Sequence, residues 1–354
     1  MLEGLGLPPR AQPFTSAVSA WRPYALAVAL SLLAVAIYPI GGRVTAVIAA
    51  ALVGAVLVSA LLEMNFTPNP LRWVLPKGRS QNVIAVVPPT GEVRRQAILV
   101  GHLDTHRTPF LFGSTARLRL FGLLSPLAFG GMAVLGGLFV AGAVTQESVL
   151  YFVSLAPTAV LLLVLPLLVE ADFTPYTAGA NDNASGAAVV LALAERLKEA
   201  PLRNTEVWTV HSGCEEVGCY GADAFLREHR ERLDGACFIA IDSVGGPGSG
   251  PCYITREGMT KRYYSDPGLV ALAEGIAARR PELGAYPKVM SIAYTEGAIG
   301  IKHGLPSITF VNLRPDGVLP YWHRPDDTVV NIDADVLARS EEFVWELLQG
   351  IDAG

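Results

Sequence analysis

The chain has 354 residues, which is enough for one large domain or two ordinary ones. Its net charge of −5 gives no electrostatic basis for binding nucleic acid, so no nucleic-acid partner is expected. Hydrophobic residues make up 51% of the sequence and charged residues only 17%, below the roughly 25% of an average soluble domain. Long apolar segments must therefore be combined with an ordinary globular domain.

Four charge-free apolar runs account for this composition: Tyr24–Ile40, Val44–Leu62, Leu120–Val144 and Val149–Val169. A membrane-spanning helix needs about 20 apolar residues, with a usual range of about 17–25, and all four runs fall within it. The alternative is a set of buried helices in a soluble core, but such helices usually have a polar face and these runs have none. The runs predict four transmembrane helices in two hairpins, with the lipid bilayer as a partner. A transporter is disfavoured because no ionisable residue lies inside a run.

The basic residues around these runs predict the orientation. Four spans put both termini and the segment between the hairpins on one side, whose flanking basic residues are Arg10, Arg22, Arg72, Lys77, Arg79, Arg117 and Arg119. The hairpin tips carry only Arg43. Because cytoplasmic loops are enriched in Lys and Arg, we expect a multi-pass membrane protein with a cytoplasmic polar domain. An extracytoplasmic domain is the alternative, although the N-terminus lacks the features of a signal peptide.

The rest of the chain predicts one α/β domain, formed by 78–117 and 170–354. An N-terminal segment, 1–77, holds the first hairpin, and the second hairpin, 118–169, interrupts the domain. Strands are expected at Gln96–Val100, Glu206–Val210, Ala236–Ile241 and Ser307–Val311, and a helix at Ala184–Glu199. Because each strand precedes a polar or Gly-rich segment, we expect a mixed, mostly parallel sheet flanked by helices.

Candidate metal ligands follow the expected strands. His102 comes after the first strand and can bind a metal through a neutral ring nitrogen, while Asp104 can accept a hydrogen bond from the other nitrogen. This His-x-Asp pattern is weak when taken alone. Asp182 lies where the expected helix begins, so its charge would be stabilised by the helix terminus as well as by a cation. The alternative for this segment is a simple helix cap.

Two adjacent acidic residues, Glu215 and Glu216, follow the second strand and precede Val-Gly-Cys-Tyr-Gly, which is not the setting of a surface charge run. If one binds a metal and the other stays free, the pair provides a ligand and a general base. Asp242 ends the third strand, and His323 lies in a polar turn near the end of the chain. His106 could touch a substrate, but a polar residue at the membrane boundary is the simpler interpretation.

Taken in order, these motifs resemble the M28 family of zinc aminopeptidases: His-x-Asp, Asp-Asn-Ala-Ser-Gly, Glu-Glu-x-Gly, Asp, and His-x-x-x-Asp-Thr. The second and third are the most specific, and the series runs through nearly all of the polar domain. The resemblance implies a zinc exopeptidase-like fold with two Zn²⁺ ions, for which Co²⁺ or Mn²⁺ can substitute. It implies one ion held by His102 and Asp242, a second held by Glu216 and His323, and Asp182 bridging the two. It also implies that Glu215 is the general base and that Asp104 is the partner of His102.

The resemblance implies an aminopeptidase, which hydrolyses N-terminal residues of peptides through a metal-bridging water, and the apolar runs indicate that it is membrane-bound. Two alternatives are a single-zinc aminoacyl cyclase or deacylase, and a non-catalytic receptor or scaffold of the same fold. A metal content of two, one or no ions separates the three. The main departure from the family is the long gap between His102 and Asp182, which the second hairpin fills. The sequence gives neither the preferred N-terminal residue nor the oligomeric state.

Overall fold

The computed structural model describes all 354 residues, which form two compact units. The first, called the α/β unit below, comprises Met1–Ser16, Lys77–His106 and Tyr176–Gly354. The second, called the helical unit, comprises Ala17–Pro76 and Arg107–Pro175. This division differs from the predicted domains because residues 1–16 belong to the α/β unit and not to the segment that carries the first hairpin.

A nine-stranded sheet forms the centre of the α/β unit, in the order β1-β2-β4-β3-β5-β9-β6-β7, with β8 paired to β6. The strands are β1 (Arg10–Ala17), β2 (Lys77–Val87), β3 (Arg95–His102), β4 (Thr205–Ser212), β5 (Cys237–Asp242), β6 (Cys252–Glu257), β7 (Tyr263–Tyr264), β8 (Tyr286–Met290) and β9 (Ser307–Val311). The central strands β4, β3, β5 and β9 are parallel, whereas β2 pairs antiparallel with β4, and β6 pairs antiparallel with β9 and β7. The prediction of a mostly parallel sheet therefore needs correction. A parallel arrangement holds for the four central strands. The complete sheet is mixed because neighbouring strands that were not predicted, such as β2 and β6, pair antiparallel with them.

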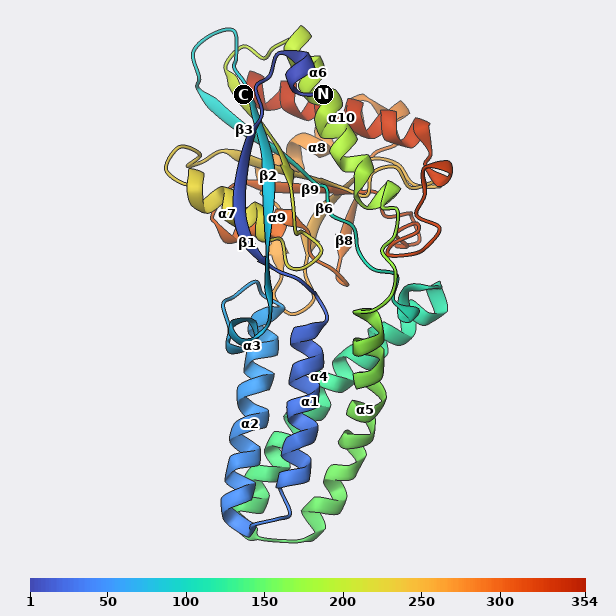
Figure 1. Ribbon diagram of the computed structural model, residues 1–354. Coiled ribbons are helices and arrows are strands. Elements are labelled where there is room, and N and C mark those ends of the chain that lie inside the picture. Colours follow the sequence, from blue (N-terminus) through green and yellow to red (C-terminus); the bar gives the residue numbers. More distant parts are fainter. The chain divides into compact units, whose positions relative to one another are not determined.

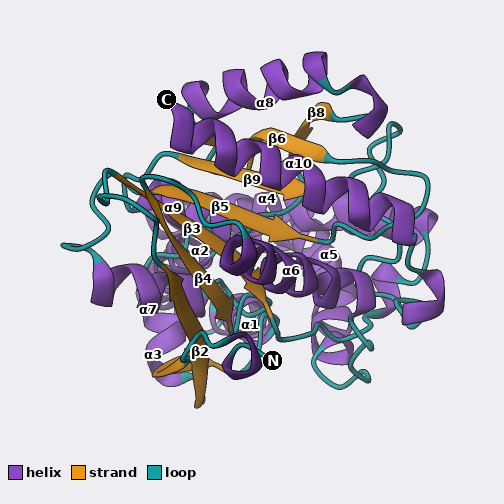
Figure 2. Ribbon diagram, turned by 90° about the horizontal axis from the view of Figure 1, so that it is seen from above, coloured by secondary structure: helices purple, strands orange, loops and turns teal.

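Helices cover both faces of this sheet (Figure 2). On one face, α6 (Gly186–Glu199), α8 (Pro267–Arg279) and α10 (Ala334–Ala353) share a core with strand residues such as Leu99 and Ile239. On the other face lie α7 (Tyr220–His229) and α9 (Glu296–Lys302), where Trp208 packs against Phe225 and Phe238 faces α9. Neighbouring residues in a strand point to opposite faces, so Phe238 and Ile239 contact different helices. Every residue of β4 is buried as a result.

The helical unit contains four long helices, which Figure 1 shows side by side, at the four predicted apolar runs. They are α1 (Arg22–Ile37), α2 (Gly42–Glu63), α4 (Thr115–Thr145) and α5 (Val149–Ala171), with the short α3 (Pro70–Val74) after α2. By length and composition α2, α4 and α5 can each cross a membrane. Helix α1 has 16 residues, and at 1.5 Å per residue it extends about 24 Å, less than the roughly 30 Å hydrocarbon core of a bilayer.

Small and medium-sized residues fill the interior of the helical bundle. Ala49, Val53 and Leu135 are completely buried there. Tyr38 stacks on Phe139, with ring centroids 4.6 Å apart, and a Cβ added at Gly142 would overlap the Tyr38 hydroxyl group. Close helix contacts of this kind are typical of membrane bundles, where small residues let the backbones approach each other.

Charged side chains are paired at the end of the bundle where α1 begins and where α2 and α5 end. Arg22 donates to Asp172 over 2.7 Å, and Arg72 pairs with Glu63. Both acidic partners are largely buried, so each arginine compensates a carboxylate that would be costly to bury alone. These pairs join α1 to α5 and α3 to α2.

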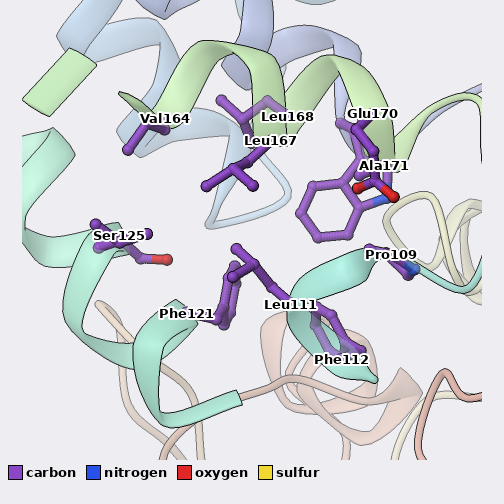
Figure 3. A pocket seen from close by; sticks show the side chains of 12 residues that line it. Pro109, Leu111, Phe112, Phe121, Ser125, Val164, Leu167, Leu168, Glu170 and Ala171 are labelled. Atoms are coloured by element: carbon purple, nitrogen blue, oxygen red, sulfur yellow. The ribbon is translucent and has the colours of Figure 1, made fainter. Parts of the chain in front are cut away.

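An apolar pocket opens between α4 and α5 at the same end of the helical unit (Figure 3). Figure 3 shows Leu111, Phe121 and Leu167 directed toward the open space, with the Glu170 carboxylate at one side. The Trp21 ring also lines the pocket and contacts the Phe112 ring edge to face, with centroids 6.1 Å apart. The pocket contains none of the predicted metal ligands.

Candidate metal centre

Two predicted ligands end neighbouring parallel strands. His102 is the last residue of β3 and Asp242 the last residue of β5, and the two strands are paired side by side. The carboxyl ends of parallel strands meet at one edge of a sheet, which is where α/β folds place their sites. His102 is buried, and its Nε2 lies 3.8 Å from Oδ1 of Asp242.

The segment Asp-Asn-Ala-Ser-Gly forms a buried turn joined to the end of β5 by Asn183. The Asn183 side chain donates to the carbonyl oxygen of Ile241 and accepts from the amides of Ser243 and Gly186 over 2.9–3.0 Å. A Cβ at Gly186 would overlap the Ile241 carbonyl oxygen, so only glycine permits this close approach. Asn183 is therefore the residue that the helix-cap interpretation fits, because its side-chain oxygen accepts a hydrogen bond from the amide of Gly186, the first residue of α6.

Asp182, in the same turn, lies between two histidines. Its Oδ1 is 3.3 Å from Nε2 of His102 and its Oδ2 is 3.3 Å from Nε2 of His323. The His323 nitrogen is also 3.1 Å from Oε2 of Glu216. We call His102 with Asp242 the strand-held subsite and Glu216 with His323 the loop-held subsite. Asp182 offers one carboxylate oxygen to each.

Asp104 anchors the turn that carries the paired glutamates. Its two carboxylate oxygens accept from the backbone amides of Glu215 and Glu216, over 3.0 and 3.1 Å. The ring nitrogen Nδ1 of His102 is 3.0 Å from the backbone carbonyl oxygen of Asp104, which accepts its hydrogen bond, whereas the carboxylate that was expected to accept it is 3.6 Å away. Asp104 thus connects the His102 strand end with the candidate ligand Glu216.

Asp327 plays a corresponding part for the Asp182 turn. Its carboxylate accepts from the amides of Asn181 and Asp182 over 2.6 and 3.1 Å, and the residue is buried. Asp327 is the aspartate of the His-x-x-x-Asp-Thr motif, for which no role was predicted. No local pattern in the sequence indicates this contact, because the Asp182 turn lies 145 positions before Asp327.

Glu215 lies beside the two subsites and belongs to neither group of ligand atoms that lie within 4.8 Å of one another. Its Oε2 is 3.9 Å from Nε2 of His102, and its Oε1 accepts from the Cys219 thiol over 3.3 Å. Burial raises the pKa of Glu215 well above its ordinary value. A buried carboxylate with a raised pKa is suited to accept a proton and release it later.

The charges of the site favour a cation. Burial raises the pKa of Glu216 to about 8, with a further contribution from the charge of Asp182. Burial alone would lower the pKa of His323, but the charge of Glu216 and hydrogen bonds to Asp182 and Glu216 raise it to about 9. Within this group, Nε2 of His102 and Oε1 of Glu216 are buried without a hydrogen-bond partner. Crowded carboxylates, histidines and unsatisfied ligand atoms fit bound divalent metal ions.

His106 lies in the same place, which the simpler interpretation of the sequence did not anticipate. It is 6% exposed, and its imidazole ring stacks on that of His323 with centroids 3.6 Å apart. One ligand atom from each of His106, Glu216 and His323 lies within 4.8 Å of the others. The interpretation of His106 as a boundary residue therefore does not account for its burial beside a candidate ligand.

The fold and site together define an α/β protein with a candidate metal centre of histidines and carboxylates at the carboxyl edge of its parallel strands. The family model of peptidase family M28 matches residues 166–348, more than half of the sequence. The chain therefore belongs to peptidase family M28.

The chain is also similar to individual proteins. The aminopeptidase YwaD of Bacillus subtilis is 25% identical over 185 residues, which cover 49% of this chain and 38% of that protein. The chain thus matches well under half the length of that relative. Among solved structures, a glutaminyl cyclase from Fimbriiglobus ruber is 15% identical over 98% of this chain and 83% of its own, with a TM-score of 0.55. A leucine aminopeptidase precursor from Bacteroides thetaiotaomicron is 15% identical, covering 94% and 99%, with a TM-score of 0.50. At these identities the structural likeness concerns the fold alone.

Proposed function

We propose that the chain is a membrane-bound zinc aminopeptidase that removes N-terminal residues from peptides. The observation that carries the proposal is the Asp182 carboxylate, which directs one oxygen toward each of two histidines. Two zinc ions bound there would polarise the scissile carbonyl group and lower the pKa of the attacking water. Membership in a peptidase family supports a peptide as the substrate.

The proposed roles follow from the positions of the side chains. His102 and Asp242 would hold one ion, Glu216 and His323 the other, and Asp182 both. Glu215, free of either ligand group, would take the proton of the attacking water on its carboxylate and deliver it to the nitrogen of the leaving amine. The Cys219 thiol bonded to Oε1 of Glu215 would help to fix the carboxylate in that position.

The helical unit supports anchoring in a membrane. We place α1, α2, α4 and α5 across the bilayer as two hairpins, with α1 tilted least because it is shortest. Apolar side chains are exposed on the outside of these helices, including Leu33, Val47, Val58, Leu127, Phe152 and Leu162. The excess of basic residues on one side favours a cytoplasmic α/β unit. A reporter fused to the C-terminus should then be active only inside the cell, and activity only outside would reverse the orientation.

The full chain, purified in detergent, provides the direct test of the function. We expect two zinc ions per chain by elemental analysis and hydrolysis of aminoacyl-coumarin substrates with a free amine. An N-acetylated substrate of the same residue should be inert, because an aminopeptidase requires the free N-terminus. Chelation should abolish turnover and added zinc should restore it. Hydrolysis that survived complete metal removal would exclude the proposed mechanism.

The same measurements separate the principal alternative. One ion per chain, combined with release of N-acyl groups or cyclisation of N-terminal residues, would indicate a single-zinc cyclase or deacylase. A chain that binds no metal and hydrolyses none of these substrates would indicate a binding protein that keeps the fold without the reaction.

A further inference from the structure

The two candidate histidine ligands are oriented by different contacts. His102 ends a central strand, and its ring is fixed by the hydrogen bond from Nδ1 to the backbone carbonyl oxygen of Asp104. His323 lies outside any helix or strand, with a backbone φ of 54°, in the left-handed region that non-glycine residues rarely adopt. The ring of His323 is covered by the ring of His106, at 3.6 Å and with only 13° between the planes.

His106 is itself held in place. It is buried, and its carbonyl oxygen accepts from the amide of Thr177 over 2.9 Å, which joins the segment after His102 to the segment before Asp182. The backbone that carries this buried ring is therefore held beside His323. At 3.6 Å and 13° the two rings are in face-to-face van der Waals contact, so neither ring can rotate without displacing the other.

The stacking geometry argues against His106 as a ligand of the ion that His323 would bind. An imidazole nitrogen binds a metal ion that lies close to the plane of its own ring. An ion that lies in the plane of the His323 ring lies outside the plane of the His106 ring, because the two planes are nearly parallel and about one ring thickness apart. With the rings stacked in this way, both histidines cannot direct a nitrogen lone pair at the same ion.

We propose that His106 is a positioning residue for the loop-held subsite, which holds the imidazole of His323 in its ligating orientation by stacking on it. The inference rests on the proposed metal site and adds a component to it. Contacts that orient a ligand typically change metal affinity by about 10–100-fold when they are removed. His102 of the strand-held subsite is oriented by the backbone carbonyl oxygen of Asp104 and not by His106, so the effect should be confined to the ion bound by Glu216 and His323.

Three variants of the full-length, detergent-purified chain test the proposal by zinc titration against a competing chelator. His106→Ala removes the ring, His106→Phe keeps a stacking ring without nitrogen atoms, and His229→Ala is the matched control. His229 is another packed histidine of the α/β unit, with its ring 5.0 Å from that of Trp208. We expect His106→Ala to weaken one of the two ions at least tenfold, while His106→Phe and His229→Ala retain both affinities within about threefold.

A second readout is the visible absorption spectrum of the Co²⁺-loaded protein, which reports ligand number and geometry. It should change in His106→Ala and be restored in His106→Phe. Wild-type affinity for both ions in His106→Ala would overturn the proposal. So would equal loss in His106→Phe and His106→Ala, because the nitrogen atoms and not the stacked ring would then be required.

Failure of the proposed function would look different. A wild-type chain that binds zinc but does not hydrolyse peptides would contradict the aminopeptidase assignment and leave the titration of His106 variants interpretable. If the wild-type chain binds one ion, a Glu216→Ala variant shows whether that ion is bound at the loop-held subsite. If it is, the affinities of His106→Ala and His106→Phe for that ion are compared in the same way. A wild-type chain without zinc affinity would overturn both proposals.

Discussion

The two subsites use equivalent donor types but reach their positions by different means. His102 and Asp242 are terminal residues of paired strands, so the hydrogen bonds of the sheet set their distance. Glu216 and His323 lie in irregular segments that no strand pairing holds. The candidate ligands of the loop-held subsite are instead contacted by side chains outside the candidate set: Asp104 holds the Glu216 turn and His106 covers His323.

This difference shows which contacts fix the positions of the candidate ligands. In the strand-held subsite, precision is a property of the fold and is shared among many backbone hydrogen bonds. In the loop-held subsite, it depends on a few individual side chains, each of which can be removed by one substitution. Sites carried on regular elements are generally more precise than sites carried on loops, unless supporting residues lock the loops.

The largest effect should come from the residue that shares the turn of Glu216 without being a ligand. Glu215→Gln keeps the size of the side chain but removes its ability to accept a proton. We expect kcat to fall by about 10²–10⁴-fold, the usual contribution of a general base, while zinc content stays unchanged. Steady-state kinetics with an aminoacyl-coumarin substrate and elemental analysis on the same sample provide the measurement.

The exposed residue Glu195 offers a matched control, because Glu195→Gln makes the same chemical change on the surface of α6. It should leave kcat unaltered. Unreduced turnover in Glu215→Gln would remove this residue from the role of base, and loss of zinc in that variant would assign it to the ligands instead.

A pair of smaller effects tests the two acidic anchors against each other. Asp327→Ala leaves the buried amides of Asn181 and Asp182 without an acceptor and loosens the shared carboxylate. Zinc titration should therefore show both ions weakened, each by about 10–100-fold. Asp104→Ala loosens the turn of Glu215 and Glu216, so it should weaken mainly the loop-held ion and lower kcat as well. Equal effects of the two substitutions on both ions would contradict the separation into subsites.

Much of the candidate site could be predicted from sequence for a physical reason. Apolar runs that end in His102, Asp242 and the paired glutamates indicate strands whose polar ends meet at one edge of a sheet. The helical unit could be predicted because charge-free runs of sufficient length are distinctive. The strand boundaries observed for β3, β4 and β5 lie within one or two residues of those expected.

What could not be predicted depends on contacts between distant residues. Asp104 bonds to Glu216 across 112 positions and Asp327 to Asp182 across 145, and no local pattern indicates either contact. The stacking of His106 on His323 is equally non-local, so burial of His106 could not be inferred from its polar neighbours. The flanking strands β1 and β2 were missed for different reasons. The edge strand β1 lacks the continuous apolar run that marks a central strand, whereas β2 carries such a run at Val83–Val87 and was overlooked.

The smallest expected effect concerns His211, near the end of β4. Its pKa is shifted by burial alone, whereas that of His102 is also shifted by carboxylates. Burial lowers the pKa of His211 to about 4, and its Nδ1 is buried without a hydrogen-bond partner. In His102, by contrast, burial also opposes the charged form, but the carboxyl groups of Asp104, Asp182 and Asp242 outweigh it and raise the pKa. His211 should therefore be neutral in the folded chain at pH 5–7, whereas in the unfolded chain it binds a proton below about pH 6.5.

The sign of the resulting pH dependence follows from proton binding. Between about pH 6.5 and 4 the unfolded state binds the proton and the folded state does not, so this contribution to stability is complete above pH 6.5 and is lost as the pH falls toward 4. The shift corresponds to at most about 3 kcal/mol. We expect thermal unfolding of the His211→Gln variant to decline less between pH 7 and pH 5 than that of the wild type. Zinc release at low pH affects both proteins, so the difference between their slopes isolates His211, and identical slopes would show that this histidine does not titrate on unfolding.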